Sequence, residues 1–480
     1  MQEQTYLFYD VETTGTHEAF DQIVQFAAIR TDAQLNELER HELFVRLNPD
    51  TVPTPEAMMT HQIPIEKLQK EGHFEYQALQ TIHQLMTQPN TINIGYNSMR
   101  FDDQFLRFGF FRNLLPPYLH QFQSGCFRMD LYPMVALYYQ FAPKVLQWPE
   151  QQGKVSLKLE NLNNENQLYI QGQAHDALTD VAVTVALARQ LKQHDSAIWQ
   201  FCHTLFHKTS DQKKASQWGP CLPDMSSQWQ QVIGIDGIFG ATAGFMSYFV
   251  SLGGHQYYRN QWCFLRLDTL DFYSYDDFDA WSQAVWVIKK RWGDLPFILP
   301  AKSRFFQQFN AEQKELVTKN QQFLASRPEW LSKLSQLVTE QLHESIDPAT
   351  VDPDASLYQE GFLDAATMGQ CYQFHQAKTV DQKIALIDQM TGNVKQRAIR
   401  IMGRMAPEQL PMAYWRVFEA YLYQITTLDE SGLRPIDYRG NPRLSVAEVK
   451  QNIEKYLNQP DLAETKRKQL KSLAYYLNLM

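Results

Sequence analysis

The first part of the chain alternates between segments whose hydrophobic patterns predict strands and segments that predict helices. Short β-rich runs occur in YLFYD, IVQFAAIR and HELFVRL, and a fourth apolar run, TINIGYN, leads into the helical pattern FDDQFLRFGFFRNLL. Apolar residues in AHDALTDVAVTVALARQLKQ recur with the period of a helix, and Asp176 stands where an N-cap is expected. The pattern predicts an α/β domain over residues 1–192.

The pattern changes over residues 197–349, where aromatic and polar residues alternate between glycines. This texture predicts a small β-structure, and helical stretches follow it. The segment IDPATVDPDA, residues 346–355, is the best linker candidate, because two prolines among small and acidic residues cannot continue a helix. Long amphipathic patterns then predict an all-helical unit over residues 350–480. We therefore expect three domains.

Composition and charge are those of a soluble globular protein. Of the 480 residues, 44% are hydrophobic and 20% are charged, and the net charge of −9 argues against a surface coated with basic residues. The five cysteines form no CxxC pair, so neither a disulfide framework nor a zinc site is predicted. The N-terminus carries no signal-peptide pattern, and no stretch is apolar for long enough to cross a bilayer. We expect a cytoplasmic protein without membrane attachment.

Two carboxylates, Asp10 and Glu12, stand in the first predicted strand with one valine between them. Residues two apart on a strand share a face, so these two anions repel each other. Asp10 follows the apolar run YLFY, and no Lys or Arg is near it in the sequence. Buried carboxylates need a cation or strong donors, and oxygen ligands suit Mg²⁺ or Mn²⁺. The pair predicts a divalent metal site, although a solvated strand edge would explain a DxE pair that stood alone.

Two further carboxylates and one histidine are candidates for the same site. Asp102 opens a predicted helix after a strand and loop, where the helix dipole would also explain an acid. Asp180 lies inside the later helix on a small or apolar face, and it is preferred over Asp176, which the N-cap role already explains. His175 can accept a proton near neutral pH, as a general base must, and the alternative for it is a surface histidine.

The order of these motifs resembles the DEDD exonuclease superfamily in its histidine variant: DxE, then FD after an apolar strand and an asparagine, then HxxxxD. PEAMMTHQI, residues 55–63, is similar to the segment that such nucleases place between their first two motifs. Two metal ions about 3.5–4 Å apart can stabilise both the attacking and the leaving oxygen of a phosphodiester. The resemblance implies two Mg²⁺ ions, replaceable by Mn²⁺, with His175 as the catalytic base. The implied metal ligands, which are also catalytic, are Asp10, Glu12, Asp102 and Asp180.

The segments YNSMRFDDQFLR, QWPEQQGKVSLKLENL and FLDAAT extend the resemblance to the bacterial exodeoxyribonuclease I family. It implies a ribonuclease H-like domain with a mixed sheet, then an SH3-like domain and a helical C-terminal domain. The implied activity is processive 3′-to-5′ degradation of single-stranded DNA to nucleoside 5′-monophosphates, in DNA repair and recombination. The implied protein partner is the C-terminal tail of the single-stranded-DNA-binding protein, and we expect a monomer. Implied substrate contacts are Glu12, Arg107, Tyr118, Phe122 and Lys158.

Several alternatives remain open on the sequence alone. Tyr118 and Phe122 would also fit a core, and Lys158 a solvated surface. The basic runs KKRW, residues 289–292, and RAIRIMGR, residues 397–404, are either DNA-backbone contacts or solvated faces. A rival activity is an RNA-directed 3′-to-5′ exonuclease, because the sequence does not show whether the pocket accepts a 2′-OH. The other rival, a catalytically inactive single-stranded nucleic-acid-binding module, is disfavoured by the intact catalytic set.

Overall fold

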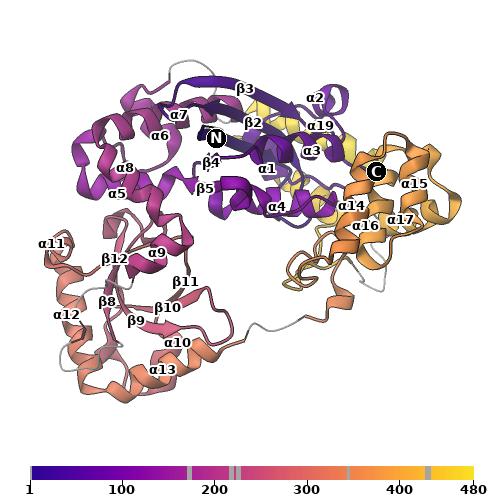
Figure 1. Cartoon of the computed structure of the whole chain (residues 1–480). Helices are drawn as coiled ribbons and strands as arrows, with labels where there is room; N and C mark the ends of the chain where they lie inside the picture. Colours follow the sequence, from indigo (N-terminus) through magenta and orange to yellow (C-terminus); the bar gives the residue numbers. More distant parts are fainter. Residues whose placement is uncertain (1–2, 170–175, 216–220, 223–228, 343–345, 427–433) are drawn as a thin grey trace. The chain divides into compact units, whose positions relative to one another are not determined.

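The computed structural model describes residues 3–169, 176–215, 221–222, 229–342, 346–426 and 434–480. Within these residues the chain forms two compact units. Unit 1 takes its residues from 1–128, 171–182 and 345–480, and unit 2 takes its residues from 129–170 and 183–344. Segments from both ends of the sequence therefore meet within unit 1 (Figure 1).

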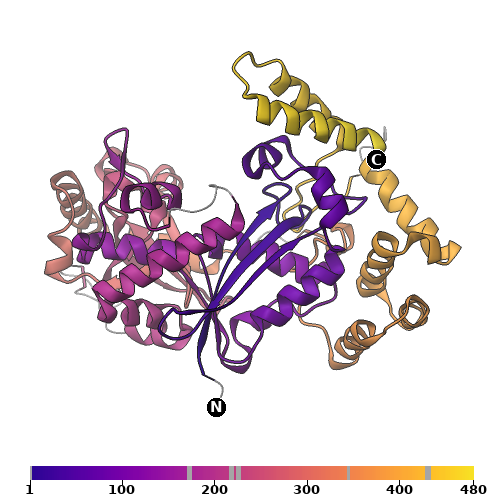
Figure 2. The same ribbon diagram turned by 90° about the horizontal axis from the view of Figure 1, so that it is seen from above.

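Unit 1 is built on a five-stranded mixed sheet with the order β3-β2-β1-β4-β5. The central strand β1 runs antiparallel to β2 and parallel to β4. Strand β2 is buried along its whole length, as expected for a strand in the interior of a domain. Figure 2 shows the long N-terminal strands of this sheet, in indigo, lying side by side. The strands are β1 (Thr5–Thr13), β2 (Ile23–Thr31), β3 (Glu37–Phe44), β4 (Thr91–Gly95) and β5 (Phe127–Asp130).

The two faces of β1 have different neighbours. Leu7, Tyr9 and Val11 point into a hydrophobic core shared with α3 (Glu75–Met86) and α4 (Asp102–Arg112). Because side chains alternate along a strand, Asp10 and Glu12 lie on the opposite face. The packing of α3 and α4 thus determines which face of the sheet carries the two carboxylates.

The C-terminal helices of unit 1 share a second hydrophobic core with α1 (Pro55–His61) and α2 (Ile65–Glu71). Met58 and Leu68 contribute from the first two helices, and Phe374, Ile401 and Leu473 contribute from the C-terminal ones. The C-terminal helices are α14 (Ala365–Gln376), α15 (Val380–Ile387), α16 (Gly392–Met405), α17 (Met412–Thr426), α18 (Val446–Leu457) and α19 (Glu464–Leu479).

The basic run on α16 is neither a solvated face nor a surface for DNA, which corrects both alternatives left by the sequence. Arg397, Arg400 and Arg404 recur at helical spacing and are all buried. Arg397 pairs with Glu360, and Arg400 forms two hydrogen bonds with Asp352, at 2.6 and 2.9 Å. These guanidinium groups are therefore engaged inside unit 1.

The proline-containing segment predicted as a linker is exposed over residues 347–350 and packed over residues 351–355. Val351 and Ala355 are buried with Phe20 and Phe111 in one hydrophobic cluster. Asp352 and Asp354 are buried as well. Arg400 of α16 offsets the charge of Asp352, and Arg404 offsets that of Asp354. This acidic segment can lie in the interior because its positively charged partners are supplied by α16, which is distant in the sequence.

Unit 2 contains a five-stranded antiparallel sheet with the order β11-β10-β9-β8-β12. Its strands are β8 (Gln231–Ile235), β9 (Met246–Gly254), β10 (Gln261–Arg266), β11 (Val287–Arg291) and β12 (Phe297–Pro300), with a small hairpin of β6 (Glu150–Gln151) and β7 (Lys154–Val155) elsewhere. Its helices are α5 (Leu131–Phe141), α6 (Leu159–Asn166), α8 (Ser196–Leu205), α9 (Lys208–Ala215), α10 (Phe278–Ala284), α11 (Ser303–Phe306), α12 (Ala311–Ser326) and α13 (Pro328–Glu340). Helix α7 (Ala177–His194) contributes residues to both units.

The second basic run, KKRW, lies at the end of β11 and just after it, and it is only partly exposed. Lys290 is fully buried and pairs with Asp211 at 2.7 Å, so it is not a DNA contact. Lys289 is more accessible, and its ammonium donates to the Gln341 side chain at 3.2 Å. None of the described helices has the length and hydrophobicity that crossing a membrane requires.

Candidate metal centre

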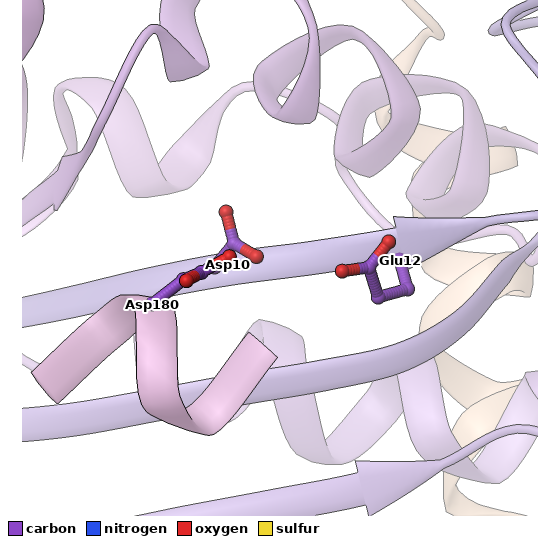
Figure 3. A group of neighbouring side chains, drawn as sticks. All are labelled: Asp10, Glu12 and Asp180. Carbon is purple, nitrogen blue, oxygen red and sulfur yellow. The ribbon is translucent and has the colours of Figure 1, made fainter. Parts of the chain in front are cut away.

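Three carboxylates converge on the face of β1 that α3 and α4 leave open. Asp10 and Glu12 come from β1, and Asp180 comes from the first turn of α7 (Figure 3). Each offers a carboxylate oxygen that lies within 4.8 Å of the other two. We call Asp10, Glu12 and Asp180 the acid cluster.

The backbone explains why these residues meet. Glu12 lies opposite Gln25 in the β1–β2 ladder, and the Gln25 side chain donates to Asp176 Oδ1 at 3.2 Å, which ties the start of α7 to the sheet. Asp176 Oδ2 accepts hydrogen bonds from the backbone and the hydroxyl of Thr179, as expected for an N-cap. With Asp176 fixed in this way, Asp180 lies one turn further along and reaches the acid cluster.

Asp102 approaches the acid cluster from α4. The β1–β4 pairing ends at Phe8 and Ile94, so the next part of β1 has no strand on that side. Asp102, which is buried at the first position of α4, accepts a hydrogen bond from the backbone amide of Val11 at 3.1 Å. The structure therefore brings together all four carboxylates that the sequence singled out.

The electrostatics of this arrangement are unfavourable without a cation. Burial, followed by the charges of Asp102, Glu12 and Asp180, raises the pKa of Asp10 well above its usual value. Burial, followed by the charges of Asp180 and Asp102, raises the pKa of Glu12 to about 8. An oxygen-only donor set with accumulated negative charge is what a hard divalent cation requires. The residues present fit such an ion.

The other predicted site residues have varied surroundings. His175 lies outside the described residues. Arg107 is buried on α4, where it donates to the Gln121 side chain at 3.2 Å and lies over the Tyr118 ring. Tyr118 is half-buried. Phe122 is 65% exposed, so it is not a core residue. Lys158 is exposed at the start of α6 in unit 2.

Asp103 is a residue near the site to which sequence reasoning gave no role. Its carboxylate is fully buried and contacts Arg128, Tyr9 and His120, whereas its neighbour Asp102 turns towards the acid cluster. A signal was present in the sequence, because a helix start needs only one acid and FDD supplies two.

Comparison with known proteins matches part of the chain to a family and finds similar proteins. A family model described as Exonuclease matches residues 7–188. Over 261 residues the chain is 34% identical to exodeoxyribonuclease I of Escherichia coli K12, covering 54% of this chain and 53% of that protein. Over 201 residues it is 36% identical to exodeoxyribonuclease I of Buchnera aphidicola subsp. Schizaphis graminum, covering 42% of each. The matched part thus spans about half the length of these curated relatives.

Solved structures extend the likeness in fold. The crystal structure of E. coli exonuclease I in complex with a dA16 oligonucleotide has a TM-score of 0.83 at 24% identity, covering 99% of this chain and 100% of that one. A structure of apo exonuclease I has a TM-score of 0.79 at 25% identity, covering 100% and 99%. A structure described as SSB/exonuclease I with an inhibitor has a TM-score of 0.80 at 24% identity, covering all of both chains.

These matches confirm the predicted fold class, which begins with a ribonuclease H-like exonuclease domain built on a mixed sheet. The fold of the whole chain is similar to that of exonuclease I. The family model spans the mixed sheet and the four carboxylates gathered on it. The predicted resemblance is confirmed as well: residues 7–188 match the exonuclease family, and the chain is similar, over about half its length in sequence, to the bacterial exodeoxyribonuclease I proteins.

Proposed function

We propose that this protein is a 3′-to-5′ exonuclease that degrades single-stranded DNA processively to nucleoside 5′-monophosphates. The observation that carries the proposal is the convergence of Asp10, Glu12 and Asp180 inside a domain that matches the exonuclease family. The names of the matched relatives support DNA rather than RNA as the substrate. A role in DNA repair and recombination, in the cytoplasm and as a monomer, belongs to the same proposal.

The proposed cofactor is Mg²⁺, bound as two ions for which Mn²⁺ can substitute. Ions held by Asp10, Glu12, Asp102 and Asp180 would stabilise charge on the attacking and leaving oxygens of the phosphodiester. The chain itself supplies the fixed geometry: β1 holds two ligands on one face, and the hydrogen bond from Val11 holds Asp102 beside them. His175, as the proposed general base, accepts a proton from the attacking water.

The strand itself would be held by stacking and by charge. Phe122, with its ring largely exposed, is proposed to stack on a base, and Lys158 to contact a phosphate. Tyr118 and Arg107 are proposed to contact the strand as well, and Glu12 to contact the terminal nucleotide. The C-terminal tail of the single-stranded-DNA-binding protein is the proposed protein partner, which the likeness to a solved SSB/exonuclease I structure supports.

The test uses 3′- and 5′-labelled single-stranded DNA, matching RNA and duplex DNA, each with Mg²⁺ or with EDTA. We expect mononucleotides from the 3′ end of single-stranded DNA alone, and only with the metal. Asp180→Asn should abolish cleavage, whereas Asp381→Asn, which changes an exposed acid on α15, should leave it intact.

Each other outcome would contradict a particular part of the proposal. Cleavage of RNA instead of DNA would keep the chemistry and move the substrate to the rival class. Cleavage that continues in EDTA would remove the metal from the mechanism. Binding of the strand without cleavage would leave only a nucleic-acid-binding module.

A further inference from the structure

Asp103 is the meeting point of four separate elements of unit 1. It is the second residue of α4, and its carboxylate accepts a hydrogen bond from the Tyr9 hydroxyl of β1 at 3.1 Å. Arg128 of β5 forms an ion pair with it, and Arg107 lies one turn along α4 at 3.7 Å. His120, in the short helix η2 (Leu119–Gln121), places Nε2 3.5 Å from Oδ1. None of these contacts belongs to the acid cluster.

Two hydrogen bonds join β1 to the start of α4, and Asp10 lies between them. One runs from the Tyr9 hydroxyl to Asp103, and the other runs from the Val11 amide to Asp102. On the strand the two bonded residues, 9 and 11, lie two positions apart. On the helix the two bonded residues, 103 and 102, are consecutive. Two hydrogen bonds so close together restrict both sliding and rotation of α4 relative to β1.

These two hydrogen bonds form where β1 is paired with β2 on one side but no longer with β4 on the other. Pairing between β1 and β4 stops at Phe8 and Ile94, just before Tyr9. Beyond that point the Asp102 side chain of α4 accepts the hydrogen bond of the Val11 backbone amide. The distance between Asp10 and Asp102, two proposed ligands on different elements, thus depends on how firmly the start of α4 is held.

The carboxylate of Asp103 is suited to this role because two arginines supply positive charge beside it. Arg128 forms an ion pair with Asp103, and Arg107 lies 3.7 Å from the same carboxylate oxygen. A charged acceptor makes stronger hydrogen bonds than a neutral one. The carboxylate therefore holds Tyr9 more firmly than a neutral acceptor would.

We infer that Asp103, acting with Tyr9, is a positioning residue that sets the separation of Asp10 and Asp102 and so controls the affinity of the acid cluster for a divalent cation. This inference rests on the proposed function, because it takes the acid cluster as the cation site. Outer contacts that orient metal ligands commonly change metal affinity or activity by about 10- to 100-fold when they are removed.

The experiment measures Mn²⁺ binding by the full chain, from the electron paramagnetic resonance signal of free Mn²⁺, together with kcat and KM on single-stranded DNA. Asp103→Asn should weaken Mn²⁺ binding about tenfold or more. Tyr9→Phe removes one hydroxyl and keeps the ring, so it should weaken binding by a smaller factor, about fivefold. In both variants kcat at subsaturating metal should fall while KM for DNA stays unchanged, and excess Mn²⁺ should restore kcat.

Matched controls separate positioning from a general loss of stability. Asp50→Asn alters another buried carboxylate that is held by an arginine and a tyrosine, Arg404 and Tyr421, but that has no acid-cluster neighbour. Tyr76→Phe removes a buried tyrosine hydroxyl that lies against Lys383 instead. Both controls should bind Mn²⁺ as the wild type does.

Two results would overturn the inference: unchanged Mn²⁺ affinity in both Asp103→Asn and Tyr9→Phe, or an equal loss of affinity in Asp50→Asn. If the wild type cleaves DNA and binds Mn²⁺ while the two variants match it, only the positioning role fails. If the wild type itself neither binds Mn²⁺ nor cleaves DNA, the proposed function fails instead.

Discussion

Arg404 on α16 forms a two-point ion pair with Asp50, 354 residues earlier in the chain, with Nε 2.9 Å from Oδ1 and Nη2 2.6 Å from Oδ2. The same guanidinium also donates to Asp354 at 2.7 Å. All three side chains are buried. This ion pair connects the N-terminal segment of unit 1 to its C-terminal helices through charged groups that are buried away from solvent.

We expect Arg404→Met to lower the free energy of unfolding by about 3–5 kcal/mol, because it leaves the carboxylates of Asp50 and Asp354 buried without their cation. Denaturant titration measures the change. The control, Arg40→Met, breaks the exposed pair of Arg40 with Glu37 and should cost at most about 1 kcal/mol. Equal losses of unfolding free energy in the two variants would show that the buried ion pairs stabilise the fold no more than an exposed pair does.

The same network predicts acid sensitivity. Burial raises the pKa of Asp50, but the charge and hydrogen bonds of Arg404, helped by Arg443, outweigh it and lower the pKa to about 2. The unfolded value is about 3.9, so the folded state binds this proton less tightly than the unfolded state does. Its contribution, about 2 kcal/mol, is present above pH 4 and is lost as the pH falls towards 2.

The pH dependence of unfolding, followed by circular dichroism, checks this prediction. In Asp50→Asn the stability curve should be flatter between pH 4 and pH 2 than in the wild type, because the titrating group is gone. A curve of unchanged slope would assign the acid sensitivity to other carboxylates.

We expect Asp180→Asn to stabilise the metal-free protein, in contrast to most substitutions. Burial and then repulsion by Asp180 and Asp102 raise the pKa of Glu12, so removing one of these crowded like charges relieves part of the strain, and a gain of about 1 kcal/mol is expected. Added Mg²⁺ should raise the melting temperature of the wild type, by preferential binding to the folded state, and should have little effect on the variant. Thermal melts with and without EDTA test both statements, and a destabilised metal-free variant would contradict the first.

Phe122→Ala should weaken the binding of single-stranded DNA without affecting stability. The ring is 65% exposed, so its removal leaves no cavity, and stacking on one base is worth about 1–3 kcal/mol. We therefore expect KM to rise about fivefold or more while the melting temperature stays constant. Tyr475→Ala on α19, where the ring is 67% exposed, is the matched control and should leave KM unchanged. A rise in KM in both variants would contradict the proposal that Phe122 stacks on a base of the DNA.

The parts of the site that follow from local rules were predictable from the sequence. Strand alternation places Asp10 and Glu12 on one face, and the N-cap role of Asp176 leaves Asp180 as the free acid of the next turn. The strand–loop–helix order around Asp102 brings it to the same sheet. Each inference needs only a few neighbouring residues and one periodicity.

Features that depend on distant partners were not predictable. The basic run on α16 has the composition of a nucleic-acid surface, and only the positions of Asp50, Asp352 and Glu360 reveal that it is buried. For the same reason, residues 351–355 read as a linker although they are packed. Charge along a sequence shows that a residue needs compensation, but not whether water or another segment supplies it.

The long separation between Asp50 and Arg404 also affects the order of events during synthesis. Ribosomes add about 5–20 residues per second, so Asp50 emerges about 20–70 s before its partner. Throughout that time an acidic group destined for the interior has to remain hydrated, which delays closure of the segment around it. The N-terminal part of unit 1 therefore stays incomplete until Arg404 has been added to the chain.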